Sequence, residues 1–283
     1  MIEKQKRVLA VHDISCVGRC SLTVALPIIS AAGHECAVLP TAVLSTHTGG
    51  FEGFTYRDLT CDIKPVSEHW QGLGLGFDAI YSGFLGSFEQ IDLLAELIGV
   101  FKTDDNVVMV DPVMGDEGKL YSIFGPKMAE GMARLCGGAD IIIPNITEAC
   151  FMVGEEYKSG PYNKKYIENL LHKLARLGPK QIALTSTWFD ENELGAAVFD
   201  ARMGKVDYVL GPRIDGHFHG TGDTFGSCLI AALLVGRSLV EAARIACTYV
   251  YECIAISVAL GQERRYGVAF ERALPWLIEE LRL

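Results

Sequence analysis

Short apolar runs of strand length recur along this chain, and most of them are followed by a longer amphipathic stretch. Strands that alternate with helical patterns indicate a mostly parallel sheet covered by helices on both faces. The runs at 107–110 and 141–143 lack polar alternation, as expected for central strands buried on both sides. The predicted strands are RVLAVHD, CAVLPTAVLS, AIYSGFLG, NVVMVDPV, DIIIPN and QIALTST, and predicted helices between them cover 21–32, 88–101 and 127–136.

The later part of the chain adds a strand pair and then helices. A short turn at Met203 and Gly204 joins the runs LGAAVFDAR and KVDYVLGP, which predicts an antiparallel hairpin that extends the sheet. Helical patterns follow over 224–234, 239–260 and 268–281, and Pro275 is expected to kink or split the last of them. The sequence contains no linker or internal repeat, so we expect residues 1–283 to form a single three-layer α/β/α domain.

Charge and cysteine content restrict the classes of partner and compartment. The formal net charge of −10 argues against nucleic acid or an anionic membrane as a partner, since both require a basic surface. Nine cysteines without a CxxC pair predict neither a disulfide framework nor a zinc site. Arg244 and Glu252 interrupt the apolar stretch 242–260, which therefore predicts a buried helix. The first apolar run is too short for a signal peptide, so we expect a cytoplasmic protein.

Polar residues mark the predicted carboxyl ends of five strands. In open parallel sheets, ligands bind in the crevice outside that edge. A polar residue can also simply mark where a strand stops, but five such positions together favour one shared site. They are Asp13, Ser82, Asp111, Asn145 and Thr185.

The segment HGTGD, residues 219–223, is the sharpest local signal. Gly220 and Gly222 flank Thr221 and let the backbone approach a ligand, and the helical pattern that follows makes this turn a helix N-terminus. Free N–H groups and the helix dipole there can receive a phosphate or a developing oxyanion. Asp223 is favoured at such a position for structural reasons alone, yet it could also take a proton from a hydroxyl during phosphoryl transfer. The two roles are compatible.

An acidic group forms the second signal. Asp111 directly follows an apolar strand, Asp116 lies in the same DPVMGDEG segment, and Glu148 follows the next strand in PNITE. Carboxylates at neighbouring strand ends suit Mg²⁺, which binds through one or two carboxylates together with water and substrate phosphates. Taken singly, Asp116 could equally be a loop carboxylate that caps a turn.

Several catalytic signatures are absent from the sequence. It has no GxxxxGK[ST] phosphate loop and no GxGxxG after its first strand, which argues against a dinucleotide-dependent dehydrogenase. It also lacks HExxH and the GxSxG nucleophile elbow. Metalloprotease and serine hydrolase functions are therefore disfavoured.

The ordered set of motifs resembles one known group of enzymes. The segments VLAVHDISCVG, STHTGG, YSGFLGS, DPVMGD, PNITEA, LTST and HGTGD run over nearly the whole chain. In that order they resemble the ribokinase-like superfamily, and within it the pyridoxal kinase and hydroxymethylpyrimidine kinase branch. The resemblance implies an ATP-dependent kinase of a small hydroxymethyl compound, and it also implies a homodimer.

The resemblance implies a role for each motif. Asp223 matches the catalytic base, and Gly220, Thr221 and Gly222 match the anion hole. The DPVxGD and PNxxE segments of the family supply groups around Mg²⁺ and ATP, and a Thr-Ser pair contacts the nucleotide. The matching positions are Asp111, Asp116 and Glu148 for the metal, and Asn145, Glu148, Thr185 and Ser186 for the nucleotide.

At the substrate end, the resemblance places Thr48 near the ring substituents, Phe84 against the ring and Tyr121 in a lid. Without the resemblance, Phe84 would be simple core and Thr48 a loop hydroxyl. Asp13 stands where pyridoxal kinases often carry a serine, whereas pyrimidine kinases more often have an aspartate nearby. Ile143 replaces a threonine that helps to hold a monovalent cation in some relatives, which leaves such a cation open.

Three functions remain in view. The aspartate of GTGD and the segment STHTGG favour a kinase of pyridoxal, pyridoxine or pyridoxamine, which would make pyridoxal 5'-phosphate in vitamin B6 salvage. Asp13 favours the alternative, a hydroxymethylpyrimidine kinase of thiamine synthesis. A non-catalytic vitamin-binding protein with the same fold is the third possibility. The sequence does not decide whether residues 52–64 form a lid or an interface.

Overall fold

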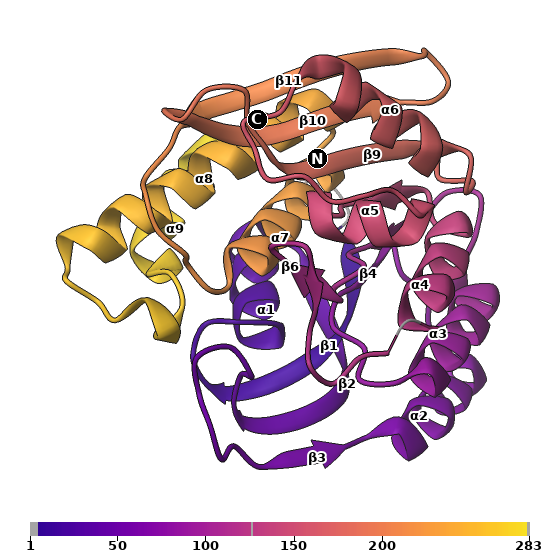
Figure 1. Cartoon of the computed structure of the whole chain (residues 1–283). Coiled ribbons are helices and arrows are strands. Elements are labelled where there is room, and N and C mark those ends of the chain that lie inside the picture. The colour runs from indigo at the N-terminus through magenta and orange to yellow at the C-terminus, as the bar shows by residue number, and fades with distance from the viewer. Residues whose placement is uncertain (1–4, 126, 282–283) are drawn as a thin grey trace.

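Within residues 5–125 and 127–281, which the computed structural model describes, nine strands form one sheet in the order β11-β10-β9-β8-β5-β4-β1-β2-β3 (Figure 1). The strands from β9 to β2 in that order are parallel, whereas β3 and β10 run antiparallel to their neighbours. A separate ribbon pairs β6 (Gly115–Asp116) with β7 (Lys119–Leu120). The strands of the main sheet are β1 (Arg7–Val17), β2 (Glu35–Thr46), β3 (Tyr56–Asp58), β4 (Ala79–Ser82), β5 (Val107–Val110), β8 (Ile141–Ile142), β9 (Gln181–Thr187), β10 (Glu193–Asp200) and β11 (Lys205–Pro212).

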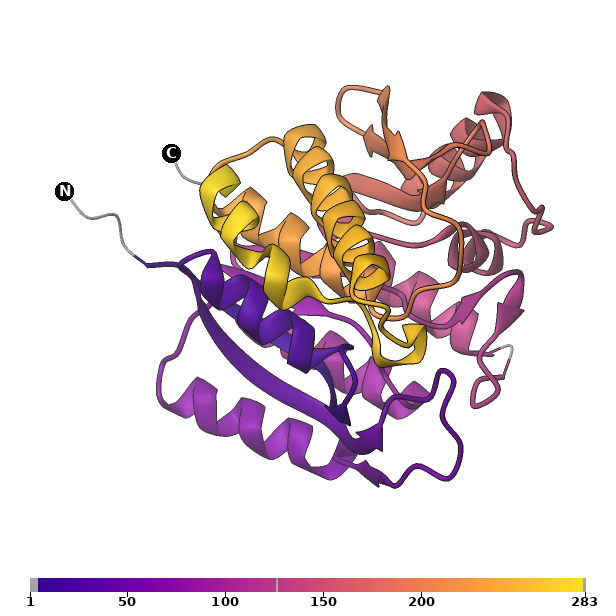
Figure 2. The same ribbon diagram turned by 90° about the vertical axis from the view of Figure 1, so that its left-hand side faces the viewer.

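Helices cover both faces of this sheet, which gives the molecule three layers. One apolar core lies between the sheet and α2 (Thr60–Gly72), α3 (Phe88–Phe101), α4 (Lys127–Gly137), α5 (Ile146–Val153) and α6 (Lys164–Ala175). A second core lies between the opposite face and the helices that Figure 2 shows in front: α1 (Leu22–Ala31), α7 (Thr221–Leu234), α8 (Leu239–Ala259) and α9 (Phe270–Leu281). The predicted α/β/α architecture is confirmed.

The pleat of β1 explains how one strand serves both cores. Leu9 and Val11 belong to the core beside α2–α6, whereas Val8 belongs to the core beside α7 and α8. Successive side chains of a strand point to opposite faces, so His12 projects on the same face as Val8. The polar end of β1 is thereby directed toward the N-terminus of α7.

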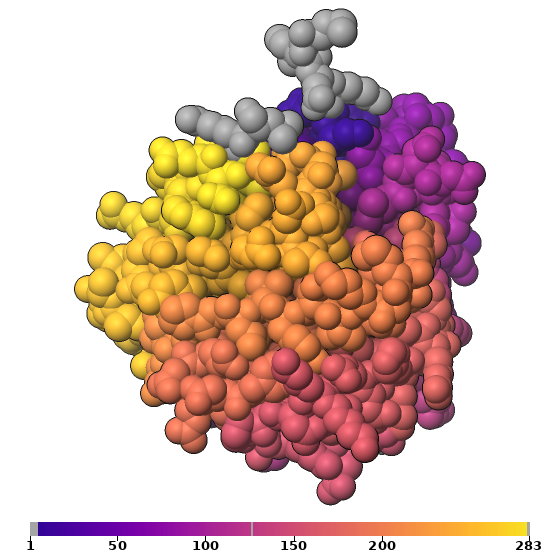
Figure 3. All heavy atoms as spheres, turned by 90° about the horizontal axis from the view of Figure 1, so that it is seen from above, coloured from indigo at the N-terminus to yellow at the C-terminus, as the bar shows by residue number. Residues whose placement is uncertain are grey.

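The predicted hairpin is present as β10 and β11, whose residues pair antiparallel from Glu193 with Pro212 to Asp200 with Lys205. β10 also pairs with β9, so the hairpin extends the parallel sheet as expected. Figure 3 looks onto this end of the molecule and shows the hairpin residues spread across its surface in orange.

Several sequence expectations need correction. Pro275 lies inside α9, which continues across it to Leu281 instead of splitting. Pro275 has no N–H to donate to the carbonyl of Glu271, so α9 loses one intrahelical hydrogen bond but stays helical on both sides of the proline. The predicted strand DIIIPN is only two residues long, and residues 52–64 contribute β3 and the start of α2. Three helices, α2, α5 and α6, were not expected from the sequence.

Asp13 does not lie at the end of its strand, since β1 continues to Val17. β1 pairs with β4 only from Val8 to Val11, and its register with β2 shifts between His12 and Ile14. A strand that loses one neighbour is free to bend, and a bulge re-aims the side chains beside it. Asp13 sits at this irregularity and is buried.

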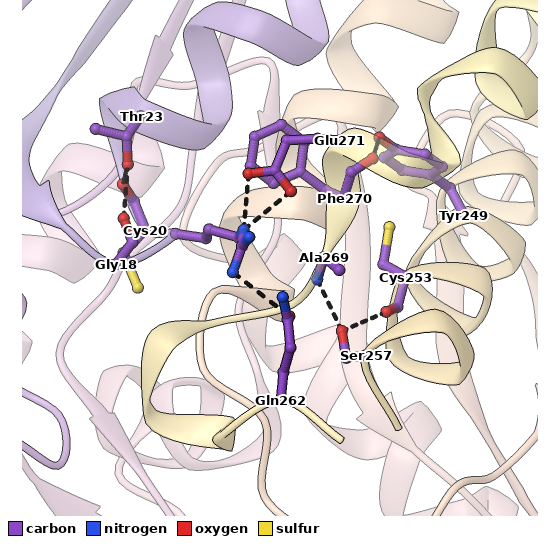
Figure 4. Close-up of polar contacts among 11 residues, drawn as sticks. Gly18, Cys20, Thr23, Tyr249, Cys253, Ser257, Gln262, Ala269, Phe270 and Glu271 are labelled. Atoms are coloured by element: carbon purple, nitrogen blue, oxygen red, sulfur yellow. Dashed lines mark hydrogen bonds and ion pairs between the residues drawn. The ribbon is translucent and has the colours of Figure 1, made fainter. Parts of the chain in front are cut away.

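α8 is long and apolar enough, by length and composition, to cross a membrane. In the structure it packs against α7, α9, β10 and β11. Tyr249, Cys253 and Ser257 on its inner side are buried, and Ser257 Oγ accepts a hydrogen bond from the N–H of Ala269 at 2.7 Å (Figure 4). This arrangement is that of a core helix, as the sequence predicted.

Candidate active site

The GTGD segment forms the N-terminus of α7. Gly220 is the N-cap residue in the left-handed conformation (φ 74°, ψ 3°), and its carbonyl accepts the N–H of Thr224 at 3.0 Å. The N–H groups of Thr221, Gly222 and Asp223 belong to the first turn, where a helix has no partner for them. The predicted anion-binding turn is therefore present as a backbone geometry.

The β1–α1 loop is clamped against this turn. A Cβ atom on Gly220 would lie less than 3.0 Å from the carbonyl oxygen of Arg19, so only glycine allows the approach. The N–H of Arg19 donates to Tyr266 O at 3.0 Å, and its guanidinium pairs with Glu271 and bonds Gln262. Figure 4 labels Glu271 and Gln262, the two side chains that accept from this guanidinium. The N-terminal loop and the C-terminal segment together fix the position of Gly220.

Asp223 is held in a largely buried position at this turn. Its side chain is 16% exposed. The pKa of Asp223 is raised to about 7. Burial is the main cause, a hydrogen bond from the backbone N–H of Ser21 acts in the opposite direction, and the negative charge of Asp13 adds to the rise. A carboxyl group with a pKa near neutrality can accept a proton and release it again, which suits a general base.

Asp13 lies on the β1 side of the same site. Ser21 donates a short hydrogen bond to Oδ1 of Asp13, and Ser15 Oγ donates to Oδ2 at 3.1 Å. Burial raises the pKa of Asp13, and the two serine hydroxyls partly offset this effect. The carboxylate is thus oriented by two neighbours that sequence reasoning did not single out, although both belong to the HDISCVGRCS segment.

Asp111 and Glu148 form the buried part of the acidic group. Glu148 Oε1 accepts the N–H of Met114 at 3.1 Å, and Oε2 accepts the N–H of Asn145 at 2.9 Å within a capping box. Burial raises the pKa of Glu148 to about 8. Burial, then Glu148 and then Asp223 raise the pKa of Asp111 well above its usual range. Asp111 also faces the anion-binding turn, because a Cβ atom on Gly222 would lie 4.0 Å from its Oδ2.

The described side chains do not supply a complete set of ligands for the expected metal ion. Among residues 5–125 and 127–281, the His, Cys, Asp and Glu side chains form no group of three or more that could hold a metal ion. Both oxygens of Glu148 are occupied by backbone N–H groups, and Asp116 Oδ1 accepts the N–H of Glu117. Oxygen donors without a full cage fit Mg²⁺ that is bound mainly through substrate phosphates. Asp111 is the donor best placed to complete such a site.

The expected nucleotide residues cluster where β8, α5 and β9 meet. Asn145 caps α5, and its Nδ2 donates to Gly115 O at 2.9 Å. Thr185 donates to Pro144 O through its N–H at 2.9 Å and its hydroxyl at 3.3 Å. Ser186 is exposed and has a positive φ of 57° at the point where the register between β9 and β10 shifts. Such strained positions are enriched at ligand sites.

Aromatic side chains line the expected substrate end. The rings of Phe84 and Phe124 are 5.7 Å apart, and the ring of Tyr121 lies 6.4 Å from that of Phe124. Tyr121 is partly exposed, and partial burial, then the charges of Glu148 and Asp116, raise the pKa of its hydroxyl. Phe124 belongs to this row but was not predicted, because no motif distinguishes it.

Thr48 is exposed in the loop after β2 and does not join this row. Its neighbour His47 accepts the N–H of Gly49 at Nδ1 (3.2 Å), so Nε2 carries the proton and donates to Arg265 O (2.5 Å). His217 Nδ1 lies 3.8 Å from Asp116 Oδ2 and links the loop before α7 to β6. Among the described residues, no hydrogen bond joins Thr48 to Phe84 or Tyr121.

Known proteins share this fold and these motifs. Residues 27–267 match the family described as phosphomethylpyrimidine kinase. A Bacteroides thetaiotaomicron protein, provisionally assigned as a phosphomethylpyrimidine kinase and solved with pyridoxal, is 36% identical with a TM-score of 0.92, covering 97% of this chain and 96% of that chain. Pyridoxal kinase from Lactobacillus plantarum is 30% identical with a TM-score of 0.90, covering 98% of both chains. The hydroxymethylpyrimidine/phosphomethylpyrimidine kinase of Bacillus subtilis is 28% identical over 78% of this chain and 79% of its own length.

The fold and the relatives together show that this chain is a ribokinase-like phosphotransferase. More narrowly, the chain belongs to the phosphomethylpyrimidine kinase family. The proteins similar to it include pyridoxal kinases. The expected family and the expectation of an enzyme are confirmed, which disfavours a non-catalytic vitamin-binding protein. The roles of individual residues stay predictions.

The close approach at Gly220 predicts a specific loss of stability. Gly220→Ala places a methyl group against Arg19 O in addition to the cost of a positive φ. Gly236, at the other end of α7, has a similar φ of 87° but no atom within 4 Å of an added Cβ. Gly236→Ala should therefore lower the free energy of unfolding by about 1–2 kcal/mol, the backbone cost alone.

Gly220→Ala should cost at least about 1 kcal/mol more than that, as overpacking does. Urea denaturation of both variants measures the difference. Equal losses for the two variants would mean that the β1–α1 loop does not constrain the turn.

Proposed function

We propose that this protein transfers the γ-phosphoryl group of ATP to the 5'-hydroxymethyl group of pyridoxal, pyridoxine or pyridoxamine, as in vitamin B6 salvage. The observation that carries the proposal is the position of Asp223: a largely buried carboxyl group in the first turn of α7, beside free backbone N–H groups and facing Asp111. Phosphoryl transfer requires this combination of a base and an anion receptor.

In the proposed reaction, the hydroxyl oxygen of the substrate attacks the γ-phosphorus while the bond to ADP breaks. The proton of the hydroxyl passes to Asp223, whose pKa of about 7 lets it act as a base near neutral pH. The N–H groups of Thr221, Gly222 and Asp223 stabilise the negative charge of the transferring group. Mg²⁺ would be held mainly by the triphosphate, with Asp111 as the protein donor and Asp116 and Glu148 in the same acidic group, and would neutralise charge on the triphosphate.

The nucleotide would lie along the ends of β8 and β9. Asn145 and Thr185 are fixed by hydrogen bonds to backbone carbonyls, and the exposed hydroxyl of Ser186 is available to a ligand. The monovalent cation stays open, since Ile143 is an apolar residue buried in the core beside α7. A homodimer, supported by the family resemblance alone, stays a prediction. A cytoplasmic location, expected from the cysteine content and the short first apolar run, stays one as well.

Two observations bear on the choice of substrate. The similarity to a structure solved with pyridoxal and to a pyridoxal kinase favours a B6 vitamer, with Phe84 and Tyr121 beside its ring and Thr48 near its substituents. The buried carboxylate of Asp13 and the relative from Bacillus subtilis favour hydroxymethylpyrimidine instead. A buried charge can discriminate strongly between ring edges, because a substrate that leaves it unpaired pays the desolvation cost.

Release of ADP with pyridoxal, pyridoxamine and hydroxymethylpyrimidine, assayed side by side, tests the proposal. We expect turnover of the B6 vitamers, loss of activity with a chelator and recovery with Mg²⁺. Full activity without a divalent ion would overturn the metal assignment. Turnover of hydroxymethylpyrimidine alone would establish the alternative function.

Asp13→Ser tests the role of Asp13 in substrate choice. If Asp13 contacts the ring edge, the ratio of kcat/KM for pyridoxal to that for hydroxymethylpyrimidine should change by about tenfold or more. Ser15→Ala is the matched control, since it removes one hydrogen bond to Asp13 but keeps the carboxylate, and the ratio should stay the same. An unchanged ratio in Asp13→Ser would remove Asp13 from the substrate pocket.

A further inference from the structure

His12 is a buried histidine that the reaction described above does not use. Its side chain is 0% exposed, and neither Nδ1 nor Nε2 has a hydrogen-bond partner among the described residues. A buried polar group without a partner costs about 1–3 kcal/mol. A hydrophobic residue of similar size would avoid this cost, so the imidazole needs an explanation in terms of function.

The ring is placed against the proposed base. His12 Nδ1 lies 3.9 Å from Asp223 Oδ1. The ring packs edge-on against Tyr81, with centroids 4.4 Å apart at 74°. It also occupies the space beside Gly83, where an added Cβ would lie less than 3.0 Å from the ring. Tyr81 and Gly83 thus confine the imidazole to an orientation in which Nδ1 points toward the carboxyl group.

The charge state of the ring follows from its burial. Desolvation lowers the pKa of His12 to about 3, so the ring is neutral near pH 7. A neutral imidazole has one N–H donor and one acceptor nitrogen. The neighbouring carboxylate favours the tautomer with the proton on Nδ1, because that nitrogen can then donate to Asp223.

We propose that His12 is a positioning residue, which donates a hydrogen bond from Nδ1 to Asp223 Oδ1 when nucleotide and substrate are bound. The inference rests on the proposed function. A movement of roughly 1 Å converts the present separation into a hydrogen bond, and catalytic hydrogen bonds are often long before ligands bind. Together with the backbone N–H of Ser21, the bond orients the carboxylate for transfer of the proton from the substrate.

The charges of the other groups that face Asp223 explain why this hydrogen bond would matter for its ionisation. Asp13 from β1 and Asp111 from β5 are acidic, and the Tyr81 hydroxyl from β4 and the Cys20 thiol before α1 are neutral near pH 7. The two carboxyl groups oppose ionisation of Asp223, and the backbone N–H of Ser21 offsets this only in part, so a second neutral donor favours the ionised base. A hydrogen bond to the charged form lowers the pKa of a carboxyl group. Loss of that bond therefore raises it.

Two substitutions of His12 separate positioning from packing. The side-chain nitrogen of Asn can take the place of Nδ1, whereas that of Gln takes the place of Nε2. His12→Gln should lose about 10- to 100-fold in kcat, the value of a hydrogen bond to a charged group, with little change in KM. In the pH profile of kcat for this variant, the acidic limb should move to higher pH by about one unit. His12→Asn should restore most of the kcat and keep the acidic limb in place.

His34→Asn is the control, because His34 is also buried but bonds Ala231 O at the far end of α7. Its kcat should be that of the wild type. Melting temperatures of all variants report the packing cost separately. Equal losses in the Asn and Gln variants, with the acidic limb unmoved, would reduce His12 to a core residue and overturn the proposal.

A measurement on the unaltered protein covers the case in which His12→Gln fails to fold. In ¹⁵N-histidine-labelled wild type with ADP and pyridoxal bound, nuclear magnetic resonance should show His12 protonated at Nδ1. Protonation at Nε2 would overturn the proposal. Wild-type turnover in the same preparation distinguishes this outcome from failure of the proposed function, which would show no activity with pyridoxal or hydroxymethylpyrimidine.

Discussion

Burial of like charges around the N-terminus of α7 is the constraint on which the site depends. Asp13, Asp111 and Asp223 all have a raised pKa, and burial is the first cause in each case. Carboxyl groups crowded together in a low dielectric cannot all be ionised. The first-turn N–H groups of α7 offset part of this repulsion, and a bound cation or a phosphate with Mg²⁺ would alter it further. The protonation states of these carboxyl groups therefore depend on which charged ligands are bound.

The rest of the fold holds this arrangement in place. Parallel strands bring Asp13 and Asp111 to one edge of the sheet, and two separate cores fix the strands from both faces. Arg19 connects the N-terminal loop to the C-terminal segment, and its carbonyl oxygen closes on Gly220. Residues that are distant in sequence thereby determine the position of Asp223, the proposed base. Precise placement matters because misplacement by about 1 Å can cost 10²-fold in rate.

The sequence predicted the layers of the fold because its signals there are local. Apolar runs such as 107–110 and the amphipathic helix at 88–101 have the expected type and bounds. The GTGD turn was also predicted, since glycine spacing and helix onset are visible in one segment. The bulge at Asp13 and the continuation of α9 across Pro275 were not, because both depend on neighbours that only the fold supplies. His12 was missed for the same reason: its importance lies in its distance to Asp223, not in any motif.

Asp223→Asn tests the central claim most directly. Asn keeps the size of the side chain but cannot accept the proton, so kcat should fall by about 10²- to 10⁴-fold with a much smaller change in ATP affinity. Stability at pH 8 should be unchanged or higher, because a carboxyl group with a pKa raised on folding destabilises the folded state at high pH. Asp62→Asn is the control, since Asp62 occupies the same position in the first turn of α2 and is exposed. Near-normal kcat in a folded Asp223→Asn protein would contradict the assignment of Asp223 as the base.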